Sequence, residues 1–280
     1  MNTRRILIVL LLLVATVPLA AQPPKLGVSP PKFELHLDDA PGTQAFRVFN
    51  YDDEPFDAEI TVHNWDLDEH SKTRILPPTE QSLDQWIVIN PVRFTIEPNS
   101  SQVVRFSVRP QVEPEPGEHR AVIYVTSQPS QEKSLSMRFT LKLGMAVYGY
   151  VGDVQRAGTL HDVRVDGPTA LFDLSSTGTA HVRLDGQYAV WLADRYPGGG
   201  EIRPLAEPGS AELPPGMLQA GALPAKPVLA GTRRQMPLQF AEALAPGEYV
   251  LDVKGRLGET AIDRAVPFVV GAAGVEVAAE

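Results

Sequence analysis

Along most of the chain, hydrophobic and polar side chains alternate, which is the pattern of strands with one buried face. The alternation is clear at 44–50, 57–65 and 102–109, and clusters of Pro, Gly, Asp and Ser separate such stretches. No stretch has a helical period of useful length. We therefore predict strands at 26–37, 44–50, 57–65, 86–96, 102–109, 119–127, 134–150, 160–166, 169–176, 181–193, 226–229, 233–240, 247–254 and 261–270.

The spacing of these strands predicts an all-β chain of two tandem immunoglobulin-like β-sandwich domains. A Pro- and Gly-rich segment at 195–225 interrupts the second set, and we expect it to carry at most one short edge strand. The predicted organisation is a leader at 1–21, a first domain at 22–152, a second at 153–271 and a flexible tail at 272–280.

The two halves share a turn motif. Pro116-Gly117-Glu118-His119 opens a strand in the first half, and Pro246-Gly247-Glu248-Tyr249 opens one in the second. In immunoglobulin-like sandwiches an aromatic residue at this corner fixes the turn through its side chain. We therefore expect Tyr249 to be a structural tyrosine-corner residue.

The first 21 residues have the composition of a secretory signal peptide. Arg4 and Arg5 precede an apolar run from Ile6 to Leu19, and small residues follow at Ala20 and Ala21. An uncleaved anchor is the alternative, but the apolar run is short for a membrane span of about 20 residues. We expect cleavage, release into a bacterial periplasm and no membrane anchor afterwards.

The composition argues against several kinds of partner and site. The net charge of −9 and the absence of a basic stripe argue against nucleic acid as a partner. There is no cysteine, so no disulfide and no cysteine-ligated metal is expected. The 26 prolines favour edges and turns over helices.

Candidate chemistry is sparse. Ser29 and Lys32 have the spacing of a Ser-x-x-Lys nucleophile, but two prolines between them disfavour the helix that this motif needs. Asp66, Asp68 and the following Glu69-His70 form an acidic cluster without the spacing of a calcium loop. We predict no catalytic residue, no metal and no cofactor, and expect that the protein is not an enzyme.

The longest alternation ends the first predicted domain. Leu135, Met137, Phe139 and Leu141 continue into Leu143, Met145 and Val147 at every second position. We expect the stretch from Leu143 to Val147 to face the domain's own core. Leu135 to Leu141 either do the same or form an edge that pairs with another chain, and the pattern alone leaves both open.

The order of several short motifs resembles the PapD-like periplasmic chaperones of pilus (fimbrial) assembly, above all their archaic-type branch. The resemblance covers most of the first predicted domain. Its motifs are Val28-Ser29-Pro30, Phe46 to Pro55, Trp65, Leu76-Pro77-Pro78-Thr79, Ile89 to Pro98, Ser101-Gln102-Val103-Val104-Arg105, Gly117-Glu118-His119-Arg120-Ala121 and Gly144 to Tyr148.

The resemblance implies two domains set at an angle, with a cleft between them, and a chaperone that binds incomplete pilus subunits. Such a chaperone lends its own strand to a subunit that lacks one and delivers the subunit to an outer-membrane usher, without a cofactor. Leu135, Met137, Phe139 and Leu141 are then the lent side chains. An exposed donor strand also favours a self-capping homodimer.

The family pattern implies roles for further residues. A pair of cleft cations anchors the subunit's terminal carboxylate, and Lys32 and Lys142 are the nearest candidates, with solvated surface lysines as the alternative. Arg105 and Arg120 are candidates for structural ion pairs. We expect Trp65 and Trp86 to be packing residues in the core or at strand ends.

Two other functions remain open. The first is a structural or adhesive cell-surface protein that keeps 135–141 in its own core. The second is a secreted enzyme or carbohydrate-binding module with a site near 195–225. The latter requires a cluster of polar or aromatic groups, for which the sequence offers only Trp191 and Tyr196 nearby.

Overall fold

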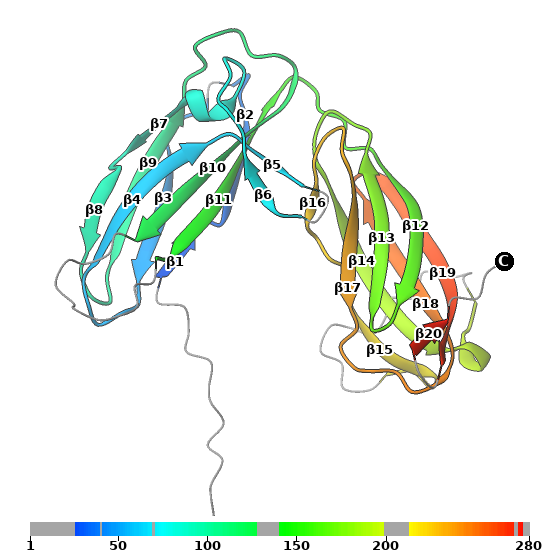
Figure 1. Ribbon diagram of the computed structural model, residues 1–280. Coiled ribbons are helices and arrows are strands. Elements are labelled where there is room, and N and C mark those ends of the chain that lie inside the picture. The colour runs from blue at the N-terminus through cyan, green and yellow to red at the C-terminus, as the bar shows by residue number, and fades with distance from the viewer. Residues whose placement is uncertain are drawn as a thin grey trace, which may run out of the picture.

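The computed structural model describes residues 26–39, 41–68, 71–127, 140–198, 213–271 and 274–276. Within these ranges the chain is all-β, with two short 3-10 helices and no α-helix. It folds into two immunoglobulin-like β-sandwiches that lie at an angle to each other (Figure 1). The predicted fold class is therefore confirmed.

The first sandwich consists of a four-stranded sheet in the order β1-β3-β9-β7 and a five-stranded sheet in the order β2-β11-β10-β4-β8. Its elements are β1 (Leu26–Ser29), β2 (Lys32–His36), β3 (Gln44–Asn50), β4 (Phe56–His63), η1 (Leu83–Gln85), β7 (Ile87–Asn90), β8 (Arg93–Ile96), β9 (Ser101–Val108), β10 (Gly117–Ser127) and β11 (Lys142–Val151).

The second sandwich consists of a three-stranded sheet, β12-β13-β17, and a larger sheet, β15-β14-β18-β19-β20, in which β16 also pairs with β14. Its elements are β12 (Gly158–Asp166), β13 (Thr169–Ser176), β14 (Val182–Leu192), η2 (Ala193–Arg195), β15 (Met217–Ala222), β16 (Pro227–Val228), β17 (Arg233–Gln239), β18 (Gly247–Leu257), β19 (Thr260–Gly271) and β20 (Gly274–Glu276). The short strand β15 lies within the Pro- and Gly-rich segment, as predicted.

Each sandwich has its own hydrophobic core, built by the alternating side chains that predicted the strands. In the first, Phe46, Val104, Phe106 and Ile123 are buried between the sheets. In the second, Phe172, Leu184 and Leu251 have the same role. The inner faces therefore account for most of the apolar alternation in the sequence.

The first strand changes sheets partway along. β1 pairs with β3 in one sheet, and after Pro30 and Pro31 the chain continues as β2, which pairs in parallel with β11 in the other sheet. Because proline cannot donate to a strand ladder, this is where the first pairing ends. The position of this crossover sets the length of β11 that is paired with β2.

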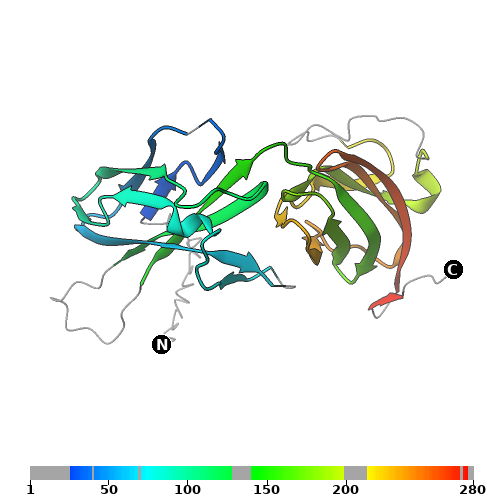
Figure 2. The ribbon, with the colours of Figure 1, turned by 90° about the horizontal axis from the view of Figure 1, so that it is seen from above.

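A two-stranded hairpin was not predicted in full. β5 (Trp65–Leu67) and β6 (Thr73–Ile75) pair only with each other and project from the first sandwich toward the second (Figures 1 and 2). The side chains of β6 are exposed all along the strand, so its sequence has no buried face to mark it as a strand. Only β5, whose Trp65 is buried, fell at the end of a predicted strand.

Candidate functional site

Strand β11 is paired on both sides along only part of its length. On one side it pairs with β10 from Lys142 to Val151. On the other side β2 pairs only with the stretch from Ala146 to Tyr150. Among the described strands, none covers this second side of β11 between Lys142 and Met145. The start of β11 is therefore an open sheet edge.

The backbone of this edge is directed outward. Ser127 N donates to Leu141 O over 2.9 Å, and alternate pairs of an antiparallel ladder exchange such bonds. Leu143 and Met145 therefore bond to β10, whereas the N–H and C=O of Lys142 and Gly144 point to the open side. Consistently, on the same side farther along, Leu37 N donates to Tyr150 O.

Side chains on β11 follow the same alternation. Met145 and Val147 are buried in the first core and Leu143 packs against it. Leu141, the next residue on that face, is 43% exposed. The other predicted donor residues, Leu135, Met137 and Phe139, lie outside the described residues. The structure thus places the buried half of the alternation in the core and leaves Leu141 at its surface end.

The two candidate anchor lysines lie apart. Lys142 Nζ lies 3.8 Å from the centre of the Tyr124 ring, a cation–π contact. Lys32 Nζ donates to Glu34 Oε1 over 2.7 Å. Lys32 pairs with Ala146, four positions along β11 from Lys142, so about 13 Å of strand separates them. The structure does not bring the two amines together.

The junction between the sandwiches is centred on Glu118. Its side chain is fully buried, and its Oε2 accepts hydrogen bonds from His181 N over 2.8 Å and lies 2.6 Å from His181 Nδ1. Arg120 Nη1 lies 3.4 Å from Oε1. Burial raises the pKa of Glu118, but the hydrogen bonds and charge of His181 and the charge of Arg120 outweigh it, so the net shift is downward.

The backbone also crosses this junction. Glu118 N donates to Thr179 O over 3.1 Å. The preceding Gly117 has a φ of +124°, which L-residues with a Cβ rarely adopt. Glycine at this position therefore lets the start of β10 approach the loop before β14.

A second ion pair lies beside the first. Arg156 Nη2 lies 3.7 Å from Glu34 Oε2, and Nη1 donates to His181 O over 3.1 Å. The guanidinium lies 4.6 Å from the centre of the Tyr150 ring, and Tyr150 Oη donates to Glu34. Although burial pushes the pKa of Glu34 upward, Lys32, His181 and Arg156 lower it overall.

Apolar packing completes the junction. Trp65, Val122, Tyr148 and Tyr150 of the first sandwich form one buried cluster with Ala180 and Leu229 of the second. The rings of Tyr148 and His181 are 4.2 Å apart, and those of Tyr148 and Trp65 are 6.2 Å apart. Burial raises the pKa of Tyr148 to about 12. Polar and apolar contacts thus hold the two sandwiches together.

The β5–β6 hairpin forms another contact across the junction. Ser71, in the turn between β5 and β6, accepts a hydrogen bond from Arg234 Nη2 on β17. Arg234 is 4% exposed and also donates to Pro227 O over 2.6 Å. Burial lowers the pKa of its guanidinium. Sequence reasoning missed this arginine because its partner lies 163 residues away.

The other predicted structural residues have distinct places. Trp86 is fully buried, and its Nε1 donates to Glu80 O over 2.9 Å. Tyr249 Oη donates to Ala245 O over 2.6 Å at the start of β18. Arg105 is exposed on β9, where it pairs with Ala45 and Asn90 in the two neighbouring strands.

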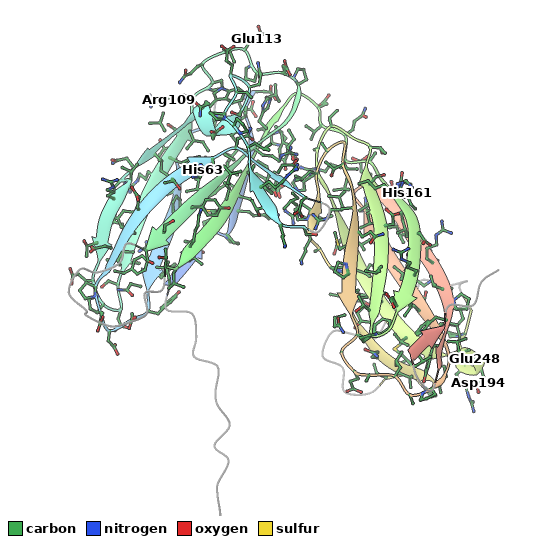
Figure 3. The ribbon with its side chains drawn as sticks, viewed as in Figure 1. His63, Arg109, Glu113, His161, Asp194 and Glu248 are labelled. Atoms are coloured by element: carbon green, nitrogen blue, oxygen red, sulfur yellow. The ribbon has the colours of Figure 1, made fainter. Side chains whose placement is uncertain are left out.

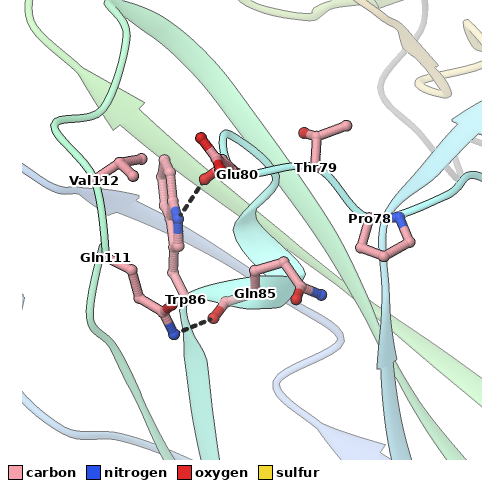
Figure 4. Close-up of a pocket in the computed structure, with 7 residues that line it drawn as sticks. All are labelled: Pro78, Thr79, Glu80, Gln85, Trp86, Gln111 and Val112. Atoms are coloured by element: carbon pink, nitrogen blue, oxygen red, sulfur yellow. Dashed lines mark hydrogen bonds between the residues drawn. The ribbon is translucent and has the colours of Figure 1, made fainter.

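Beside Trp86 lies a half-open pocket of about 420 Å³ (Figure 4). Its lining mixes apolar and amide side chains, and Gln111 Nε2 donates to Gln85 O across it over 3.5 Å. The lining residues are Pro78, Thr79, Glu80, Gln85, Trp86, Gln111 and Val112. Glu80 is the charged residue of this lining.

Neither a metal cluster nor a membrane span is found within the described ranges. No group of three or more His, Cys, Asp or Glu residues is placed to hold a metal ion there. No helix of the described chain is long and apolar enough to cross a membrane. Of the predicted acidic cluster, Asp66 pairs with Arg74 over 2.6 Å, while Glu69 and His70 lie outside the described residues.

Comparisons with known proteins give similarity in structure only. No protein-family model matches the chain, and no curated protein matches its sequence. A chain of the CsuC–CsuE chaperone–tip adhesion subunit pre-assembly complex, from archaic chaperone–usher Csu pili of Acinetobacter baumannii, is 13% identical, with a TM-score of 0.45; the match covers 86% of this chain and 97% of that one. The E. coli chaperone DraB is 14% identical, with a TM-score of 0.43 and coverage of 86% and 95%. The Pseudomonas aeruginosa CupB2 chaperone is 11% identical, with a TM-score of 0.42 and coverage of 86% and 97%.

Proposed function

We propose that this protein is a periplasmic chaperone that binds incomplete immunoglobulin-like pilus subunits by lending them a strand and delivers them to an outer-membrane usher. The observation that carries the proposal is the open edge of β11 from Lys142 to Met145. It follows directly after the apolar alternation of Leu135, Met137, Phe139 and Leu141. The order of the family motifs in the first sandwich supports the same function.

Strand addition explains both features chemically. A subunit that lacks its last strand leaves an apolar groove and an unpaired ladder. The outward N–H and C=O groups of Lys142 and Gly144 supply ladder bonds, and side chains at alternate positions fill the groove. Burial of each large apolar side chain is worth roughly 1.5–3 kcal/mol. Binding needs no nucleotide and no bound cofactor.

The junction has a role in this function. Strand addition on one sandwich leaves the rest of a subunit close to the other, so the angle between the sandwiches must be fixed. The buried pair of Glu118 and His181 and the contact of Arg234 with Ser71 link the two sandwiches at separate places. We infer a preformed cleft that needs no ordering when a subunit binds.

We keep Lys32 and Lys142 as proposed carboxylate anchors, but as alternatives to each other, since the structure does not bring the two amines together. A terminal carboxylate that reached Lys32 would compete with Glu34, and one that reached Lys142 would draw the amine from the Tyr124 ring. Lys142 lies on β11, and Lys32 lies on the neighbouring strand β2. The two lysines therefore flank the route along which an added strand would run.

We also propose the organisation inferred from the sequence. Residues 1–21 are removed on export, 22–152 carry the donor strand, 153–271 form the second domain, and 272–280 are a tail. A free chaperone would cover its open edge by forming a homodimer. The alternative function is a structural or adhesive cell-surface protein without chaperone activity.

The test is a periplasmic pull-down with the tagged mature chain, compared with the variants Phe139→Glu and Val92→Glu and analysed by mass spectrometry. Val92 is a matched control, since it is 49% exposed but lies outside the proposed donor strand. Small exported β-proteins captured in stoichiometric amounts by wild type and Val92→Glu, but not by Phe139→Glu, would support the proposal. Equal capture by all three would contradict it and favour the structural alternative.

A further inference from the structure

The outer face of the larger sheet in the second sandwich carries a small cluster away from the junction. Ala189, Trp191 and Met217 are buried there, and Tyr196, which follows η2, packs against them. Figure 3 places Asp194 of η2 at the end of the second sandwich that lies farthest from the first. This cluster is therefore separate from the open edge of β11.

The strand register adds charged residues to the cluster. Ala189 on β14 pairs with Asp252 on β18, two rows from the pair of Trp191 and Val250. Two residues farther along β18, Lys254 pairs with Asp263 on β19. Since residues two apart on a strand share a face, the aromatic and charged side chains lie on the same outer surface.

Three polar atoms in this cluster are left without a hydrogen bond. Trp191 Nε1, Tyr196 Oη and Asp252 Oδ1 are buried without any hydrogen bond. They are three of the seven such side-chain atoms among the described residues. Asp252 is only 4% exposed, and Trp191 is 7% exposed. Buried polar groups are normally hydrogen-bonded, so three unsatisfied atoms in one place require an explanation.

The nearest cation pairs with Asp252 only over a long distance. Lys254 Nζ lies 3.6 Å from Asp252 Oδ1 but donates to Asp263 Oδ1 over 2.6 Å. Burial accordingly raises the pKa of Asp252. Burial and the neighbouring carboxylates of Asp252 and Asp263 also raise the pKa of Tyr196, which shows that these groups influence one another electrostatically. One oxygen of this buried carboxylate is thus left without a hydrogen bond and can accept one from a ligand.

We propose that Trp191, Tyr196 and Asp252 form a binding site for a neutral sugar residue. A sugar hydroxyl both donates and accepts, so one ring can satisfy the indole N–H, the phenol O–H and the carboxylate oxygen. The C–H face of a sugar also suits an aromatic surface, and the Trp191 and Tyr196 rings are 6.2 Å apart in an edge-to-face arrangement. With Asp252, Lys254 and Asp263 together carrying one net negative charge, an anionic ligand is disfavoured.

We expect the Tyr196 side chain to move when the sugar enters. It is only partly buried, and its hydroxyl has no hydrogen bond to hold it in place. The helix η2 that precedes it also lacks a side-chain capping bond. The proposal requires this ring to move, since Trp191 Nε1 and Asp252 Oδ1 are themselves buried.

This inference is independent of the proposed chaperone function, and its test uses the mature chain. The indole N–H signals are followed by ¹H–¹⁵N NMR while methyl β-D-glucopyranoside, methyl β-D-galactopyranoside or N-acetyl-D-glucosamine is added. The variant Trp191→Phe identifies the Trp191 signal among those of the three tryptophans. We expect that signal alone to shift, saturably, with at least one of the sugars.

The variant Asp252→Leu separates binding from folding. We expect it to raise the melting temperature, because it removes a buried carboxylate that contacts Lys254 over only 3.6 Å, while Lys254 keeps its shorter pair with Asp263. We also expect it to weaken sugar binding at least tenfold. If no sugar shifts the Trp191 signal, or if Asp252→Leu binds as wild type does, the proposal is wrong. A fall in melting temperature would assign Asp252 a structural role instead. Saturable shifts with L-arginine alone would replace the sugar by a cationic ligand.

Discussion

Glu118 of the first sandwich and His181 of the second are joined by one carboxylate oxygen, which lies 2.8 Å from the backbone N and 2.6 Å from Nδ1 of the histidine. Both side chains are almost completely removed from solvent. A carboxylate in such a place is stable only while its hydrogen bonds and its neighbouring charges are present. This contact is therefore one of several that hold the two sandwiches together.

Replacing Glu118 by alanine should separate the unfolding of the two sandwiches. The change leaves the buried N–H of His181 without its acceptor, at a cost of about 1–3 kcal/mol for each unsatisfied group. Differential scanning calorimetry should then show two transitions or one broadened transition. Glu248→Ala is the matched control, because it changes the equivalent turn of the second half, where the side chain is exposed and lies at the far end (Figure 3). Similar curves for both variants would mean that Glu118 does not couple the sandwiches.

The junction should also weaken in acid. The pKa values of Glu118 and Glu34 in the folded chain lie below their ordinary value of 4.5. The folded state thus favours the ionised carboxylates, so their stabilisation is fully present above about pH 4.5 and is lost as the pH falls through the lower folded values. We expect the difference in melting temperature between wild type and Glu118→Gln to shrink as the pH falls below about 4.5. A difference that grew in acid would contradict this assignment.

The tyrosine corner is a separate test of the second sandwich. Tyr249→Phe keeps the ring, which stacks 5.5 Å from Phe268, but removes the hydroxyl that donates to Ala245 O. We expect a loss of about 0.5–1.5 kcal/mol in the free energy of unfolding, measured by urea denaturation. Tyr51→Phe is the control, since Tyr51 is 56% exposed. An equal loss in both variants would remove the special role of Tyr249.

The same corner shows what the sequence can and cannot predict. His119 takes the equivalent place in the first half, with Nε2 2.8 Å from Glu115 O, four residues back as Ala245 is from Tyr249. The shared Pro-Gly-Glu turn made this resemblance visible in the sequence. The strands were likewise predictable, because a buried face imposes alternation on every strand that has one.

The partners across the junction were not predictable in this way. Glu118 and His181 are 63 residues apart, and Glu34 pairs with an arginine in the other half of the chain. Such pairs depend on how two finished sandwiches meet, and no local pattern records that. The glutamate that follows Pro-Gly at both corners illustrates the difference: Glu118 is buried against a neighbour, whereas Glu248 is exposed.

The last prediction isolates the main chain of the open edge. Lys142→Ala removes the amine but keeps the outward N–H, whereas Lys142→Pro removes both. Because that N–H bonds to neither β10 nor β2, the proline should leave the ladder between β10 and β11 intact. If β11 lends its backbone to a subunit, Lys142→Pro should bind about two- to tenfold more weakly than Lys142→Ala, the equivalent of one ladder bond of about 0.5–1.5 kcal/mol. Affinities are measured by calorimetry with a captured subunit, and circular dichroism checks the fold. Equal affinities of the two variants would show that a subunit strand does not pair with the edge from Lys142 to Met145. A lower affinity of Lys142→Ala than of wild type would measure the contribution of the amine itself.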